Sequence, residues 1–97
     1  MKSYKQERQR ELIGKLTRNL TRACLLVEGD AKKDCPVDTG RLRSSITHEV
    51  EGTVGYVETD VDYAPYVELG TYKMRPQPFL FPALEKNKAK IQDMLND

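Results

Sequence analysis

Apolar residues recur at every third or fourth position along the first part of the chain, with charged residues between them. This spacing places them on one face of a helix, which we expect from about residue 3 to residue 34. Pro36 disfavours helical geometry in the residue before it, so the helix should end near Asp34 or Cys35. The apolar face consists of Leu12, Leu16, Leu20, Ala23, Val27 and Ala31.

From residue 46 the apolar period changes to two, which predicts strands with one buried face. Glu51-Gly52 predicts a tight turn, and the β-branched residues from Thr53 to about Val61 predict a returning strand. Gly55 would mark either a bulge or a close backbone contact in this antiparallel hairpin. The inward positions are Ile46, His48 and Val50 on the first strand and Val57, Thr59 and Val61 on the second.

The stretch from Asp62 to Ala83 is dense in aromatic residues and prolines. It holds three of the five tyrosines, both phenylalanines and four of the five prolines. It predicts a short helix from Tyr63 to Glu68 that Gly70 ends, followed by a loop. Pro82 suits the first position of a last helix. Phe79 and Phe81 would anchor that helix, and its apolar stripe would be Leu84, Lys88, Ile91 and Leu95.

Together these elements predict an α+β fold in a single domain, residues 1–97. It would contain a long N-terminal helix, a small antiparallel sheet (the hairpin plus a further short strand), a short central helix and a C-terminal helix. The chain is 38% hydrophobic and 32% charged, with a mean hydropathy of −0.67. This balance suits a small core in a protein that completes its stability by assembling.

The sequence also predicts localisation and the redox state of the cysteines. No apolar run is long enough for a membrane span, and the first residues lack the apolar segment of a signal peptide, so we expect no membrane contact and synthesis in a cytoplasm. Cys24 and Cys35 lie eleven residues apart. On one helix that is about 16 Å, too far for a disulfide. We therefore expect two reduced thiols.

Charge is distributed in bands along the chain. Residues 1–34 carry a net charge of +4, residues 35–72 carry −5 and residues 73–97 carry +2, for a total of +1. Such banding bears on association rather than on the fold. It suggests that the basic first helix and the acidic middle segment could be complementary surfaces.

Candidate catalytic and metal-binding residues are few. A set of Ser44 or Ser45 with His48 and Asp38 lacks any nucleophile elbow, and His48 is better explained as a half-buried sheet residue. Three carboxylates two residues apart could hold Ca²⁺ or Mg²⁺, but the EF-hand glycine and distal glutamate are missing, so an acidic edge facing solvent or a partner is the better interpretation. These carboxylates are Glu58, Asp60 and Asp62. We expect no cofactor and no enzymatic activity.

Three blocks, in this order and spacing, carry a resemblance to a known family. They are Cys35–Ile46 (CPVDTGRLRSSI), Asp62–Thr71 (DYAPYVELGT) and Pro78–Ala83 (PFLFPA). The chain resembles the small head–tail joining or tail-completion proteins of lambda-like long-tailed bacteriophages and prophages. One departure is the short link between the second and third blocks, where relatives often carry a longer loop.

The resemblance implies a structural protein of the virion neck, assembled in the bacterial cytoplasm. Its partners would be further copies of itself in a ring, with six as one candidate number, and the head connector and tail-tube or tail-terminator proteins, with a passing contact to DNA. The blocks themselves are explained as fold anchors: Pro36, Asp38, Thr39, Gly40, Leu42, Tyr63, Tyr66, Glu68, Gly70, Phe79, Phe81 and Pro82. Asp38 or Thr39 would cap a short helix, and the tyrosines would seat the central helix on the sheet.

Two hypotheses of function remain. The first is the structural neck protein, whose assembly candidates are the charged residues Lys5, Arg8, Arg10, Arg18, Glu58, Asp60 and Asp62. The second is a small nucleic-acid-binding or regulatory module that uses the basic first helix. No aromatic residues interleave these basic residues and no groove-reading motif is present, which favours the first hypothesis.

Overall fold

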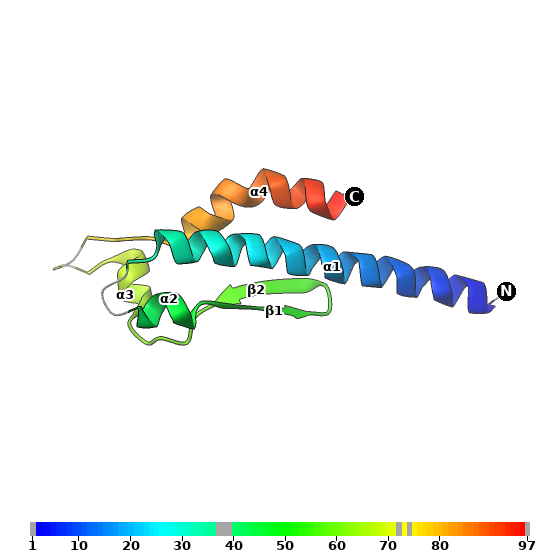
Figure 1. Ribbon diagram of the computed structural model, residues 1–97, viewed down its shortest axis with the longest axis horizontal. Coiled ribbons are helices and arrows are strands. Elements are labelled where there is room, and N and C mark those ends of the chain that lie inside the picture. Colours follow the sequence, from blue (N-terminus) through cyan, green and yellow to red (C-terminus); the bar gives the residue numbers. More distant parts are fainter. Residues whose placement is uncertain (1, 37–39, 72, 74, 97) are drawn as a thin grey trace.

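One long helix, α1 (Lys2–Asp34), runs along most of the length of the molecule, and its C-terminal half carries the other elements (Figure 1). The computed structural model describes residues 2–36, 40–71, 73 and 75–96, and the side chains of those between 6 and 95. The molecule measures 64 × 24 × 20 Å. A 33-residue helix spans about 50 Å, so α1 alone accounts for most of the long dimension.

The helix predicted from the apolar spacing is confirmed. It continues to Asp34, two residues before Pro36. Both cysteines are buried and free, as expected from their separation along one helix. None of the described helices is both long and apolar enough to cross a membrane.

A tight corner leads from α1 into the short helix α2 (Arg41–Ser45). Gly40 has φ +77°, a left-handed conformation that glycine adopts without the strain of a Cβ atom, and its carbonyl accepts the Ser44 N–H at 3.0 Å. Leu42 points inward and is buried, as predicted. The predicted caps, Asp38 and Thr39, lie outside the described residues.

The hairpin consists of β1 (Thr47–Glu51) and β2 (Val54–Glu58), paired antiparallel. Its two-residue turn contains Gly52 at φ +63°. Gly55 pairs with Val50 in an uninterrupted register, so it is not a bulge. It is instead a close approach: a Cβ atom at Gly55 would lie 2.6 Å from the Cys24 sulfur of α1.

The sheet is smaller than predicted. The returning strand ends at Glu58 rather than near Val61, and within the described residues the sheet has two strands. Thr59 turns the chain there, because its hydroxyl pairs with Ser45 Oγ and accepts the Val61 N–H at 3.2 Å. The chain therefore leaves the ladder early, and Asp60 and Asp62 do not belong to a strand.

Helix α3 (Ala64–Leu69) is the predicted short helix, and Gly70 ends it at φ +77°. The Gly70 N–H donates to the Tyr66 carbonyl at 2.8 Å. Tyr63 packs against the core, and the Arg41 guanidinium lies 5.9 Å from its ring centre. The expectation that Tyr66 also seats this helix on the sheet is wrong, because 58% of Tyr66 is exposed.

The last helix, α4 (Leu80–Asn96), packs against α1 on the side away from the hairpin (Figure 1). Its buried positions are Phe79, just before the helix, Ala83 and Asn87, spaced by four. The Asn87 amide donates to Asp30 Oδ2 at 2.6 Å and to the Ala83 carbonyl at 2.7 Å, which satisfies a buried polar group. Lys86 Nζ donates to Asp34 Oδ2 at 3.0 Å.

The predicted stripe of α4 is therefore wrong in part. Leu84, Lys88 and Leu95 are exposed, and only Ile91 of that stripe packs against the core. The helix is rotated so that small Ala83 and polar Asn87 face α1, which allows the two helices to approach closely. Asn87 carries no apolar signal, so the periodicity did not identify this face.

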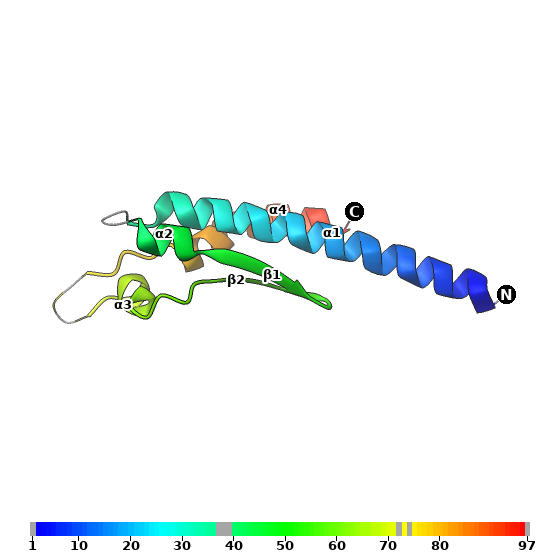
Figure 2. The same ribbon diagram turned by 60° about the horizontal axis from the view of Figure 1, so that its bottom comes forward.

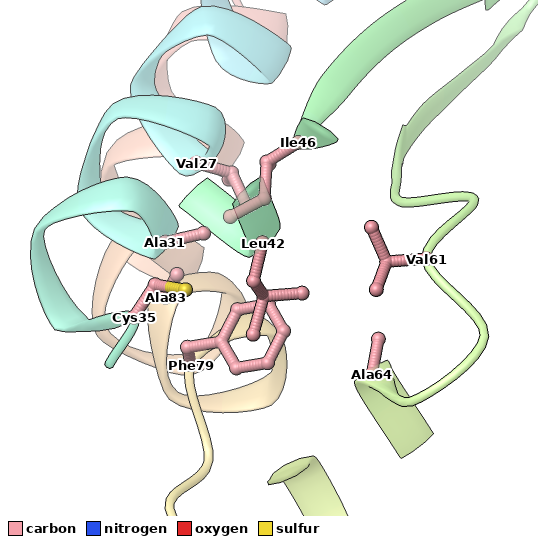
Figure 3. Packing of buried hydrophobic residues seen from close by; sticks show 9 residues of the cluster. All are labelled: Val27, Ala31, Cys35, Leu42, Ile46, Val61, Ala64, Phe79 and Ala83. Atoms are coloured by element: carbon pink, nitrogen blue, oxygen red, sulfur yellow. The ribbon is translucent and has the colours of Figure 1, made fainter. Parts of the chain in front are cut away.

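The core lies at the C-terminal end of α1. Leu42 and Phe79 point toward each other at its centre, with Ala31, Cys35 and Ala83 on one side and Val61 and Ala64 on the other (Figure 3). Phe79 is fully buried and Ile46 nearly so. Each such side chain contributes about 1.5–3 kcal/mol by leaving water. The prediction that Phe79 anchors the core is thus confirmed.

Candidate assembly surface

An apolar groove of about 670 Å³ opens between α1, β2, the end of α3 and the start of α4. Its floor is the α1 face that contains Leu20, Ala23 and Val27. Of the thirteen described residues that line it, only Glu68 is charged. The groove therefore exposes to water a continuous extension of the hydrophobic core.

Large apolar side chains stand at the rim of this groove. Leu69 is 75% exposed, Phe81 64% and Leu84 49%. The expectation that Phe81 anchors α4 in the core is wrong; the helix places Phe81 on the outside while Phe79 takes the buried position. Contiguous exposed apolar surface of this kind marks sites of interaction with other proteins.

Glu68, the charged residue among the described lining of the groove, holds the start of α4. Its carboxylate accepts the backbone N–H groups of Phe79 at 3.2 Å, Leu80 at 2.9 Å and Phe81 at 3.3 Å. Pro82, in the first turn of α4, has no N–H to satisfy. A carboxylate at a helix N-terminus also interacts favourably with the helix dipole. Glu68 thus joins α3 to α4 and fixes the groove wall that carries Phe81.

The N-terminal half of α1 projects beyond the hairpin turn and the end of α4 (Figures 1 and 2). We call residues 6–18 the arm. Leu12 is 68% exposed and Ile13 60%, although Leu12 lies on the same helical face as the buried Ala23 and Val27. The apolar face of α1 therefore continues past the part of the molecule that covers it.

The basic assembly candidates lie on the arm. Arg8, Arg10 and Arg18 are exposed, whereas the side chain of Lys5 lies outside the described residues. Over residues 6–18 there are four Lys or Arg against two Asp or Glu. The arm is thus an amphipathic helix with exposed apolar residues and a basic excess.

The acidic assembly candidates lie beside the part of the groove that β2 and α3 form. Glu58, Asp60 and Asp62 are exposed and line a second hollow, of about 500 Å³, that shares Val57, Glu68, Leu69 and Leu80 with the groove. Among the described residues, no group of three or more His, Cys, Asp or Glu side chains is arranged to hold a metal ion. These carboxylates form an acidic margin to an apolar surface.

The remaining candidate residues have structural contacts. His48 Nδ1 lies 3.3 Å from Glu28 Oε2, which links β1 to α1. Burial raises the pKa of the Cys24 thiol, and the neighbouring Glu28 carboxylate raises it further. Burial likewise raises the pKa of the Cys35 thiol. Both thiols are therefore poor nucleophiles.

Sequence reasoning found the charged margins but missed the apolar rim. Leu69 received no role, and Phe81 and Leu84 were expected to be buried. A partial signal was present: Leu69 is the last residue of α3 and Phe81 lies in the first turn of α4, so both are at the ends of their helices. For Phe81 and Leu84, the packing of α4 on α1 decides that the side chains point away from the core.

Comparison with known protein families identifies the chain. Residues 1–70 match the family described as "Bacteriophage HK97-gp10, putative tail-component". The match includes the Cys35–Ile46 block and nearly all of the Asp62–Thr71 block, so the family resemblance predicted from those blocks is confirmed. Comparison with curated proteins and with solved structures finds no match. The match spans well over half of the sequence, and the chain therefore belongs to the HK97 gp10-like family of bacteriophage tail components.

Proposed function

We propose that this tail component acts in the neck of the virion, as a ring of subunits that completes the tail and joins it to the head without catalysing a reaction. The observation that carries the proposal is the pair of apolar surfaces, the arm and the groove, that the folded chain leaves in water. A small protein with two such surfaces gains stability when other subunits cover them. The partners in this proposal are further copies of the chain, the head connector and the tail tube or terminator.

Charge supports the same role. The basic arm and the acidic margin of the groove lie on different parts of one subunit, as head-to-tail assembly into a ring requires. Such charges steer encounter and fix orientation more than they set affinity. Six is one candidate for the number of subunits, and mass measurement of isolated necks would determine that number.

The test is a phage in which the gene is inactivated. We expect filled heads and free, completed tails to accumulate separately, as seen by negative-stain microscopy, because only the joint would be missing. Supplying the wild-type protein should restore joined particles. Normal particles without the protein, or heads with no tail tubes at all, would contradict a role in the neck.

A charge reversal makes the test sharper. Asp60→Lys with Asp62→Lys changes two exposed acids of the margin and should leave the fold intact while it reduces joining. Glu85→Lys with Asp93→Lys changes two exposed acids of α4 and serves as the matched control. Equal effects of the two double variants on joining would show that the acidic margin has no special part.

The alternative function, nucleic-acid binding, has the exposed arginines of the arm in its favour. Binding through phosphate contacts would make retention on duplex DNA fall steeply as salt rises from about 50 to about 200 mM. Strong, salt-dependent retention that is lost in Arg8→Gln with Arg10→Gln would favour this alternative over the neck role.

A further inference from the structure

We propose that the arm of one subunit docks into the apolar groove of a second copy of the chain, head to tail. This inference rests on the proposed function, because it names the contact through which the ring would form. The occupant of the groove is thus committed: the helical segment 6–18 of a neighbour, with Leu12 and Ile13 inserted between the rim residues Leu69 and Phe81.

The apolar surfaces match in kind. The arm presents two large aliphatic side chains that are more than half exposed, followed one turn later by the half-buried Leu16. The groove presents an apolar floor with a rim of similarly exposed side chains. Placing an amphipathic helix in an apolar groove is a common mode of recognition, in which residues three or four apart act as anchors.

The arm cannot fill the groove of its own subunit. The floor of the groove, from Leu20 to Val27, belongs to the same continuous helix as the arm. Leu12 lies eight residues, or about 12 Å, along the axis from Leu20, and an unbroken helix cannot fold back onto its own side. Figure 2 shows the arm extending away from the body of the molecule. A second molecule must supply the segment.

Charge decides between pairings of two copies. An arm in a groove brings Arg8 and Arg10 toward the margin that contains Glu58, Asp60 and Asp62. Two arms side by side would instead bring basic segments together, and two grooves face to face would bring acidic margins together. Like charges placed opposite each other oppose association, so the arm-to-groove pairing is favoured.

The contact is heterologous, and this has a structural consequence. When one arm occupies one groove, the first subunit retains an empty groove and the second retains a free arm. The same contact can then repeat from subunit to subunit, which gives a ring if the rotation closes and a filament if it does not.

Complementation between two variants tests the pairing in solution. Leu12→Gln with Ile13→Gln impairs the arm, and Leu69→Gln with Phe81→Gln impairs the groove rim; all four side chains are exposed, so the fold should persist. At concentrations where wild-type protein associates, each variant should bind itself about tenfold more weakly or worse. An equal mixture should form a one-to-one heterodimer and stop there, as measured by sedimentation velocity. Leu25→Gln, 49% exposed and on the opposite face of α1, is the control and should assemble like the wild type.

Cysteine trapping in purified phage particles gives the second measurement, which does not depend on association in solution. After treatment with a mild thiol oxidant, the double variant Leu12→Cys with Leu69→Cys should give a ladder of disulfide-linked multimers on a non-reducing gel. Leu12→Cys alone, and Leu25→Cys with Leu69→Cys, should give none. The native cysteines are buried with raised thiol pKa values, so they should react slowly.

The outcomes separate the two proposals. Rings that persist in both the arm and the groove variant, or particles that contain the protein without the ladder, would overturn the arm-to-groove contact and leave the neck role standing. Loss of assembly in the arm variant alone would indicate arm-to-arm pairing and overturn it as well. A protein that is absent from the neck of the particles, and that is monomeric in solution, would overturn both proposals.

Discussion

The two halves of α1 share one apolar periodicity but differ in what covers them. In the C-terminal half, Ala23, Val27 and Ala31 are buried beneath the hairpin, α2 and α4. In the N-terminal half, Leu12 and Ile13 are more than half exposed. Periodicity thus identifies which face of a helix is apolar, but it does not show how much of that face the other elements cover.

The two halves also differ in side-chain size. Where α1 is covered, the contact residues are small, such as Ala23 and Ala31 of α1, Gly55 of β2 and Ala83 of α4. Small residues allow backbones to approach closely. The arm carries leucine and isoleucine, which protrude and suit insertion between the side chains of a separate molecule.

The largest expected effect on stability is at the centre of the core, at the covered C-terminal half of α1. Phe79→Ala should lower the free energy of unfolding by about 3–5 kcal/mol, because it leaves a cavity where a fully buried ring packs against Leu42. Leu12→Ala on the arm should change it by less than about 0.5 kcal/mol in the monomer. Urea denaturation at low protein concentration measures both. Equal losses would mean that the arm is packed within the monomer, contrary to the comparison.

The same contrast explains which parts of the fold could be predicted from the sequence. The long helix, the hairpin, the short helix and its end at Gly70 follow from local rules, that is, from period, turn residues and helix caps. The orientation of α4 does not, because it depends on Asn87 finding Asp30 across the helix interface. No local pattern carries that information.

The residues of the groove show a second reason why parts of the structure could not be predicted from the sequence. Glu68 and Phe81 both belong to blocks recognised in the sequence, yet one is a helix cap and the other a rim residue. Their roles depend on how the segment between α3 and α4 returns the chain, a tertiary property. Charge was easier to predict: Glu58, Asp60 and Arg10 are exposed where the banding suggested.

A second prediction tests close packing between α1 and the hairpin. Gly55→Ala places a Cβ atom 2.6 Å from Cys24 Sγ, so the hairpin or the cysteine must shift, and we expect a loss of about 1–3 kcal/mol. Gly29→Ala, with nothing within 4 Å of the added atom, should instead stabilise the helix by about 1 kcal/mol. Opposite signs in thermal melting are the expected result. A neutral Gly55→Ala would mean that the hairpin rests loosely on α1.

A third prediction concerns the junction between the core and the groove wall. Glu68→Ala removes the acceptor of three backbone N–H groups at the start of α4 and should cost about 2 kcal/mol. Glu68→Gln keeps an oxygen acceptor and should cost less. Glu58→Ala, an exposed acid on β2, is the control and should stay within about 0.5 kcal/mol of the wild type. If Glu68→Ala behaves like Glu58→Ala in urea denaturation, the cap does not hold α4.

The smallest expected effect is a pH dependence of the unfolding free energy that arises at the C-terminal half of α1. The Asn87 amide, which donates to Asp30 Oδ2 at 2.6 Å, lowers the pKa of Asp30; the nearby Lys86, Lys33 and Lys90 lower it further, against an opposing effect of desolvation. A carboxyl whose pKa is lower in the folded chain adds stability above its ordinary pKa of about 4, and this stability is lost as pH falls through the folded value.

Asp30→Asn removes that titration while it leaves an amide oxygen that can accept from Asn87. The variant should therefore lose less stability than the wild type as the pH is lowered below about 4, so the difference between the two unfolding free energies should shrink in acid. Glu11→Gln on the arm makes the same carboxylate-to-amide change and controls for the loss of one charge. Urea midpoints for the three proteins, measured across this pH range, provide the comparison. A constant difference between the wild type and Asp30→Asn would show that the contact between Asp30 and Asn87 does not distinguish the charged carboxylate from the neutral one. The hydrogen bond between Asp30 and Asn87 would then join α1 to α4 without any contribution from the charge of Asp30.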